Sequence, residues 1–134
     1  NLVTQQTAEW NAEKAQQIVQ SVIDAGTPFN VIYAENDDMA KGAVAALDKA
    51  NISHGVGKDV IVMGFDCNKW ALEELLNQNW NYDGQCNPYQ ASYIEDVIKK
   101  LESGEKIDEK TIIMDEKGFD ATTITQDDVD QFGI

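Results

Sequence analysis

Apolar runs of strand length alternate along this chain with longer stretches whose apolar residues recur every three or four positions. This alternation is typical of repeated strand–helix units around a parallel sheet, and few other folds are compatible with it. The plainest strand signal is Val60–Phe65, and a second buried strand is expected at Phe29–Glu35. Shorter strands are expected at Tyr82–Cys86 and Thr111–Met114. The sequence therefore predicts an α/β fold with an open, mostly parallel sheet and helices on both faces.

Amphipathic helices are expected between and after these strands. In chain order they are Trp10–Ala25, Met39–Ala50, Lys69–Gln78, Pro88–Glu102 and a short terminal helix after Thr125. We expect Asp37 or Asp38 to cap the second helix and Asn87 to cap the fourth. Thr125 with Asp128 three residues later is typical of a capping box at the last helix.

Size and charge exclude several classes of protein. The 134 residues suit one compact domain, and no apolar run reaches the roughly 20 residues of a membrane span. A net charge of −14 repels phosphate backbones and anionic lipids, so nucleic acid is not an expected partner and direct membrane insertion is not expected. The chain does not open with a secretion signal, so any such signal is expected to lie outside this sequence.

Polar side chains follow three of the expected strands at the point where each strand ends. Asn36 follows FNVIYAE, Asp66 follows VIVMGF, and Gln85 comes at the end of NYDG. In parallel α/β sheets, ligands collect outside the carboxyl ends of the strands. Amide and carboxylate groups can pair with adjacent hydroxyls, so the three residues together predict a rim that binds sugar. Taken singly, Asn36 or Asp66 could cap a helix and Gln85 could be a solvated strand end.

Trp10 lies near a helix start that should face the same rim. Its flat ring could stack on the apolar face of a pyranose, although ordinary core packing is the commoner fate of tryptophan. The ring therefore adds a candidate stacking group to the three polar residues. No role is assigned to Trp70 or Trp80.

The two cysteines leave two readings open. With the lone His54 they are too few for a zinc site, and Cys67 and Cys86 are too far apart in sequence for a redox pair. Each directly follows a candidate rim residue, so on neighbouring strands the two could approach to a Cα separation of about 5.5 Å and form a disulfide. Such a bond would suit an oxidising compartment. The alternative is a pair of buried free thiols.

Catalytic and metal-binding patterns are not supported. His54 has no recognisable serine and carboxylate partners and is expected to be a solvated loop residue, and the stretch HGVGK lacks the spacing of a phosphate loop. The pair Asp37 and Asp38 lacks the spacing of a calcium loop and is most simply a set of helix caps on a solvated face. We therefore expect no metal, no cofactor and no enzymatic activity.

Several stretches resemble the type I periplasmic binding proteins for ribose, galactose and related sugars. They are VIYAENDDMAKGAVAALDKA, VIVMGFD, LESGEKI and TAEWN, and together the resemblance covers essentially the whole chain. The resemblance implies that Trp10 is the stacking aromatic and that Asn36 and Asp66 bind sugar hydroxyls. It further implies that Gln85 is the amide at the crossing between two lobes.

The resemblance also implies a division of the chain. Residues 1–86 match a second lobe without its opening strand and helix, residues 87–113 match a segment crossing to a first lobe, and residues 114–134 match the return and tail. A monosaccharide held between two lobes and the membrane subunits of an ABC importer would be the partners, in an extracytoplasmic location. With half of the pocket absent, sugar binding should be no tighter than millimolar. The apolar stripe of Pro88–Glu102 should cover itself against another copy or an unusual face of the same domain.

Two other classes of protein remain to be weighed. The effector domain of a lactose-repressor type regulator is similar in fold and in the same motifs, and a helix-turn-helix at the amino terminus of the full-length protein would favour it. A small flavodoxin-like enzyme would need a phosphate or acid–base constellation, which the sequence does not offer. Pentose, hexose and furanose binders share the rim residues, so the sequence does not specify the sugar.

Overall fold

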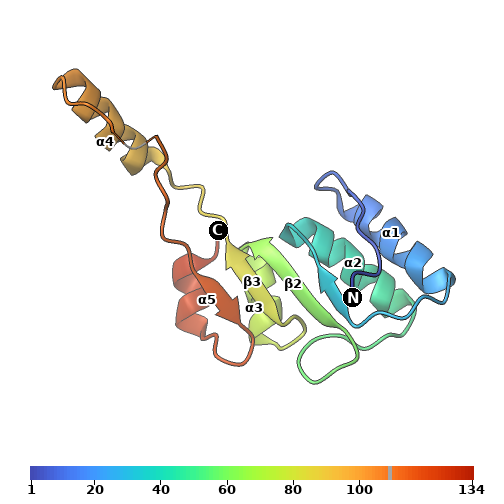
Figure 1. Ribbon diagram of the computed structural model, residues 1–134. Helices are drawn as coiled ribbons and strands as arrows, with labels where there is room; N and C mark the ends of the chain where they lie inside the picture. The colour runs from blue at the N-terminus through green and yellow to red at the C-terminus, as the bar shows by residue number, and fades with distance from the viewer. Residues whose placement is uncertain (109) are drawn as a thin grey trace.

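The computed structural model describes residues 1–108 and 110–134. Its elements in chain order are α1 (Ala12–Asp24), β1 (Val31–Tyr33), α2 (Asp37–Lys49), β2 (Ile61–Asp66), α3 (Lys69–Leu76), β3 (Tyr82–Gln85), α4 (Ala91–Glu102), β4 (Gly118–Asp120) and α5 (Gln126–Phe132). Figure 1 shows one sheet with helices packed beside it, and α4 projecting away from this body. The expected α/β class is confirmed.

The four strands form one sheet in the order β1-β2-β3-β4. The pairs β1–β2 and β2–β3 are parallel, and β4 runs antiparallel to β3 with Tyr82 opposite Asp120. The expected strand at Thr111–Met114 is wrong. Those residues lie in the extended segment that leads back from α4 to the sheet, and they have no strand beside them. A strand needs a partner edge, and the chain meets the free edge of β3 only at Gly118–Asp120.

One apolar cluster forms the core, between the sheet and the helices α2, α3 and α5. Its largest fully buried side chains include Leu47, Val62, Leu72 and Trp80, and Val129 of α5 joins them. On the opposite face Val31, Tyr33 and Ile61 stay substantially exposed; this alternation follows from the two-residue period of a strand. In the described part of the chain the core helices cover one face of the sheet, and the helix layer expected on the second face is not present.

The helix caps differ in part from expectation. Asn36, rather than Asp37 or Asp38, caps α2, and Thr125 with Asp128 forms the expected capping box of α5. The fourth helix does not open at Pro88: Asn87 accepts a hydrogen bond from the backbone N–H of Tyr89 at 2.8 Å, which makes a local turn before the helix begins. A side chain occupied in such a turn is not available to cap a helix.

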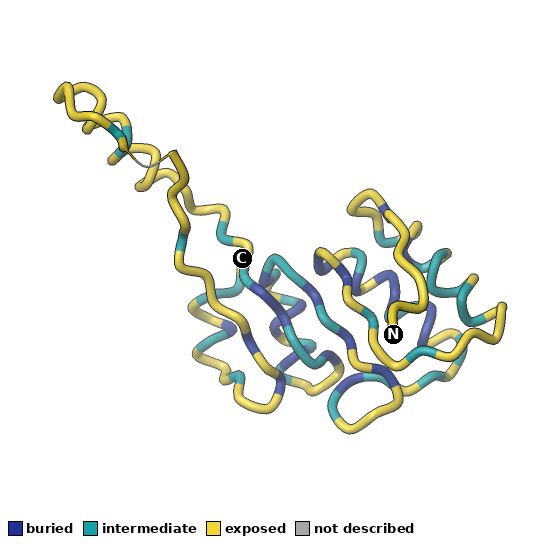
Figure 2. Tube along the Cα trace, viewed as in Figure 1, coloured by how far each residue is buried: buried dark blue, intermediate teal, exposed yellow. Residues whose placement is uncertain are grey.

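The arm carrying α4 does not pack on the body. None of its helical residues is buried, and the stripe of Ile94, Ile98 and Leu101 is 55%, 49% and 59% exposed. Figure 2 shows the arm as almost continuously exposed. The expectation that this stripe would find a face of its own domain is therefore wrong, whereas its covering by another copy stays a prediction. No helix in the described ranges is long and apolar enough to cross a bilayer.

Candidate sugar-binding rim

The structure places Asn36, Asp66 and Gln85 at one edge of the sheet. Asp66 and Gln85 are register partners at the carboxyl ends of β2 and β3. Tyr33 is the register partner of Met63. Asn36 lies three residues after Tyr33 and Asp66 three residues after Met63, so Asn36 comes to the level of Asp66. Parallel strands end at the same edge, which is why residues distant in sequence meet here. We call these three residues the rim.

Asn36 both caps α2 and faces the rim. Its Oδ1 accepts a hydrogen bond from the Met39 backbone N–H at 2.9 Å, and the residue is 8% exposed. The cap fixes the amide orientation, and within the described residues no hydrogen bond uses the amide nitrogen. Capping and ligand binding are therefore compatible, because the cap uses the oxygen and leaves the two N–H donors.

Asp66 and Gln85 are partly buried where their strands end. Asp66 has φ 127°, so the chain turns sharply there. Asn68, two residues later, occupies the N-cap position of α3 without a side-chain capping hydrogen bond. Burial raises the pKa of Asp66, and the nearby charge of Asp38 adds to that rise. Gln85 accepts a hydrogen bond through Oε1 from the Lys117 backbone N–H at 3.2 Å. Its amide nitrogen keeps two donors that the rim can use.

Trp10 lies immediately before α1 and is not part of it. Its φ of 53° is a left-handed conformation, and Asn11 takes over as the helix cap by accepting from the Lys14 N–H at 2.9 Å. The indole is 74% exposed, so ordinary core packing is excluded. Trp10 lines a groove together with Glu35, which directly precedes rim residue Asn36. An exposed ring in this position is free to stack on a ligand.

The proposed disulfide is absent. Cys67 and Cys86 are free thiols, the first buried and the second exposed. Cys67 has φ 62°, and its Sγ lies 3.9 Å from Oδ1 of the buried Asp83 as a donor. The turn after Asp66 thus buries Cys67, while Cys86 stays at the surface. Both expectations, a disulfide between the two cysteines and two buried free thiols, are therefore wrong. The cysteines give no support for an oxidising compartment.

Two buried carboxyl groups, neither of them a predicted ligand residue, lie close to the rim. Asp37 and Asp83 are both fully buried, whereas Asp37 was expected on a solvated face. Oδ2 of Asp37 accepts from the backbone N–H and the side-chain Nδ2 of Asn68 at 2.9 and 3.1 Å. These bonds tie the turn after β2 to the start of α2, and so they position Asp66 beside Asn36.

Burial disfavours charge on both of these groups. Burial raises the pKa of Asp37 to about 6, and the hydrogen bonds from Asn68 partly offset this rise. It raises the pKa of Asp83 to about 9, and the negative charge of Asp37 adds to that rise. Asp83 is therefore protonated at neutral pH. The sequence signal for Asp83 was an acidic residue inside the expected short strand Tyr82–Cys86. In the structure Asp83 and Gly84 are the two buried residues of β3.

His54 also differs from expectation. It is not a solvated loop residue: Nδ1 lies 2.8 Å from the Asn79 carbonyl oxygen, Nε2 lies 3.0 Å from Oδ1 of Asp48, and the side chain is 13% exposed. These contacts fasten the loop before β2 to α2 and to the turn that follows α3. Across the described residues, no group of three or more His, Cys, Asp or Glu side chains is arranged to hold a metal ion.

The sequence of this chain is similar to those of known binding proteins. A family model for the periplasmic binding protein domain matches residues 1–106. The chain is 30% identical over 120 residues to the fructose import binding protein of Bifidobacterium longum, covering 88% of this chain and 35% of that protein. It is 32% identical over 77 residues to the ribose import binding protein of Bacillus subtilis, covering 58% of this chain and 23% of that protein.

Solved structures give the same result for the fold. The periplasmic binding protein of the arabinose ABC transporter from Shewanella sp. ANA-3, bound to L-arabinofuranose, matches with a TM-score of 0.82 and 26% identity over 91% of this chain and 40% of that one. A galactofuranose binding protein matches with a TM-score of 0.85 at 21% identity, over 98% of this chain and 45% of its own, which supports the fold alone. The chain spans about a third or less of the two curated relatives' lengths.

Proposed function

The chain belongs to the family of periplasmic binding protein domains, and from this membership we propose that it forms part of the sugar-binding component of an ABC importer. The ligand is a monosaccharide, and the membrane subunits of an importer are the partners of the whole protein. The relatives reported above are transport binding proteins, which favours this function over a lactose-repressor type regulator. The proposed role is binding, without catalysis, in an extracytoplasmic location.

The meeting of Asn36, Asp66 and Gln85 at one edge carries this proposal. The register of β1, β2 and β3 supports a shared site, and the three side chains offer two amide groups and one carboxylate. Amide nitrogens donate to sugar oxygens and the carboxylate accepts from sugar hydroxyls, so adjacent hydroxyls can be paired. The exposed ring of Trp10 adds an apolar surface for the sugar ring.

We further propose that residues 1–86 form most of one lobe, that residues 87–113 cross toward another lobe, and that residues 114–134 return. The first three helices and the strands β1 to β3 all lie within residues 1–86, which supports that boundary. The arm with α4 leaves the body after β3, and β4 rejoins the sheet beside it, as a crossing and return would require. A site between two lobes would have only one of its faces here.

A titration of the chain with galactose, glucose, ribose, arabinose and fructose, followed by amide NMR shifts, tests the sugar site. We expect saturable shifts at the side-chain amides of Asn36 and Gln85 for at least one sugar. Dissociation constants should be millimolar or weaker, because a water-exposed hydrogen bond contributes only about 1 kcal/mol.

Asp66→Asn should weaken that binding below detection, because it replaces the carboxylate acceptor. Asp115→Asn removes the same charge at an exposed position of the return segment and should leave the shifts unchanged. Equal binding by both variants would contradict the assignment of Asp66 to the site. Micromolar binding would show that the site is complete within these residues and would refute the two-lobe reading.

A further inference from the structure

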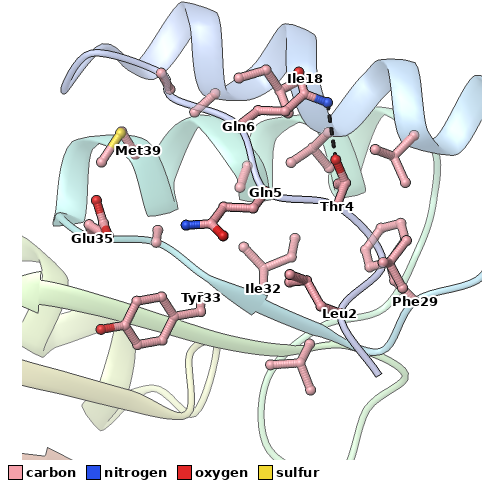
Figure 3. A pocket seen from close by; sticks show the side chains of 18 of the residues that line it. Leu2, Thr4, Gln5, Gln6, Ile18, Phe29, Ile32, Tyr33, Glu35 and Met39 are labelled. Carbon is pink, nitrogen blue, oxygen red and sulfur yellow. Dashed lines mark hydrogen bonds between the residues drawn. The ribbon is translucent and has the colours of Figure 1, made fainter.

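A pair of buried carboxyl groups lies close to the rim and is joined to it through the backbone. Figure 3 shows Glu35 where β1 leads into α2, and Asn36 of the rim and then Asp37 follow it in the chain. Asp37 is fully buried. Asp83 of β3 is also fully buried, and it lies two residues before Gln85 of the rim. We call Asp37 and Asp83 the carboxyl pair.

The two carboxyl groups come together over Gly64 in β2. Gly64 is the register partner of Asp83, and register partners on parallel strands point their side chains to the same face of the sheet. Oδ1 of Asp37 occupies the space on that face, because a Cβ placed at Gly64 would lie only 2.6 Å from this oxygen. The same Cβ would lie 2.9 Å from the ring of Trp80, which is 1% exposed. The sheet, α2 and this ring therefore shield the pair from water.

One shared proton satisfies this arrangement. Within the described residues, no amide, amine, hydroxyl or thiol group donates to Oδ1 of Asp37 or Oδ2 of Asp83, although a side-chain hydrogen bond joins the two residues. Their other oxygens are occupied, by Asn68 and by the thiol of Cys67. A hydrogen bond between two carboxyl groups needs a proton on one of them. Burial raises the pKa of Asp83 further than that of Asp37, so Asp83 carries the proton and donates it toward Asp37.

Asp37 connects this proton to the rim. Its Oδ2 accepts from the backbone N–H and the Nδ2 of Asn68 at 2.9 and 3.1 Å, and these bonds hold the turn after Asp66. Its backbone also forms a hydrogen bond with the carboxylate of Asp66. Loss of the proton from Asp83 leaves two buried negative groups facing each other. The repulsion moves Asp37 away from Asp83 and loosens both of its contacts at the rim.

The other acidic groups around the pair do not replace the proton. Asp38 of α2 and Asp66 at the end of β2 add negative charge on this side of the sheet. Burial and the neighbouring carboxylates raise the pKa of the Cys67 thiol, so this group stays neutral. A deprotonated pair would therefore gain no stabilisation from these groups.

The lysines of the two adjacent helices are directed elsewhere. Lys41 of α2 lies over the ring of Trp70, with Nζ 4.7 Å from the ring centroid. Lys69, which begins α3, lies 3.4 Å from the carboxylate of Asp130 in α5. No lysine is among the main groups that shift the pKa of either member of the carboxyl pair. The proton itself is thus what neutralises the second carboxyl group.

We propose that Asp83 is a positioning residue for sugar binding, whose proton holds the rim in its binding arrangement through Asp37 and the turn at Asn68. This inference rests on the proposed function of the rim. It adds that sugar affinity falls at alkaline pH, because only chains that keep the proton have an assembled rim. Asp83 itself does not touch the sugar.

The test compares the parent chain with Asp83→Asn and Asp83→Leu. The amide of Asp83→Asn donates toward Asp37 at every pH, whereas Asp83→Leu fills a similar volume without a donor. Each protein is titrated with ribose and with fructose at pH 7 and pH 9, followed by amide NMR shifts, and its fold is checked by circular dichroism. The Kd of the parent chain should rise about twofold at pH 9, where half of the chains have lost the proton. Asp83→Asn should keep one Kd at both pH values, and Asp83→Leu should bind about fivefold more weakly at pH 7.

A second readout needs no sugar. The backbone and side-chain amide signals of Asn68 should titrate with a midpoint near pH 9 in the parent chain and stay constant in Asp83→Asn. If the Asn68 signals titrate but neither sugar gives saturable shifts at pH 7, the proposed sugar site is refuted and the link between the pair and the rim is supported.

Two results would overturn the positioning role. One is the same change of Kd with pH in the parent chain and in Asp83→Asn, and the other is an Asn68 signal that does not change between pH 7 and pH 10. If Asp83→Leu fails to fold, the comparison of the parent chain with Asp83→Asn decides, because that variant keeps the hydrogen bond and lacks only the titration.

Discussion

The buried carboxyl pair predicts that this protein becomes less stable as the pH rises from 6 to 8. Asp83 has its pKa raised from 3.8 to about 9 by burial and by the charge of Asp37. Between these two values the folded chain holds a proton at Asp83 that the unfolded chain has released. The stabilisation from this group is complete below pH 3.8 and is lost as the pH rises through about 9.

The size of the effect follows from one proton. A difference of one bound proton changes the free energy of unfolding by about 1.4 kcal/mol per pH unit. From pH 6 to pH 8 the expected loss is therefore about 3 kcal/mol, a large share of the roughly 5–15 kcal/mol typical of a domain. Asp37, whose pKa is raised to about 6, adds a further loss toward the lower end of this range.

Asp83→Asn should remove most of this pH dependence. The amide is neutral at every pH and has nearly the shape of the protonated acid, and it can still donate toward Asp37. Urea unfolding followed by circular dichroism at pH 6, 7 and 8 measures the slope. The exposed change Asp115→Asn, which removes a similar carboxyl group, should leave the slope as it is.

Two results would refute this reasoning. If Asp83→Asn keeps the full slope, another group carries the pH dependence. If the variant is much less stable than the parent chain at pH 8, Asp83 functions there as a carboxylate with a partner, and its pKa is not raised.

Two further predictions concern the core and the arm. Trp80→Ala should reduce the free energy of unfolding by about 3–5 kcal/mol in denaturant titrations, because the ring is 1% exposed and packs edge-on against Trp70 at 5.8 Å; a loss below 1 kcal/mol would contradict its place in the core. The exposed stripe of α4 should cause concentration-dependent association in sedimentation experiments, and Ile98→Lys should abolish it. A parent chain that stays monomeric at millimolar concentration would contradict the second prediction.

The sequence alone determined the element order and the rim. Periodicity of apolar residues is a local property, so the helices α1, α2 and α3 and the strand β2 lie within a few residues of their expected ranges. Parallel strands end at one edge, so the positions of Asn36, Asp66 and Gln85 at or just after the ends of their strands were enough to place them together. Capping by Thr125 and Asp128 is equally local, because four residues decide it.

Only the tertiary structure decided which of these groups are buried and what they meet. Asp37 follows Asn36 in a run of acidic residues that suits a solvated helix start, yet the turn after β2 covers it. The backbone turn at Cys67 buries this cysteine, whereas Cys86 is exposed. Residues 118–120 pair with β3, so the last strand lies there and not at Thr111–Met114 as expected. Burial and strand pairing depend on surfaces contributed by distant segments, and a local pattern carries no information about which surfaces meet.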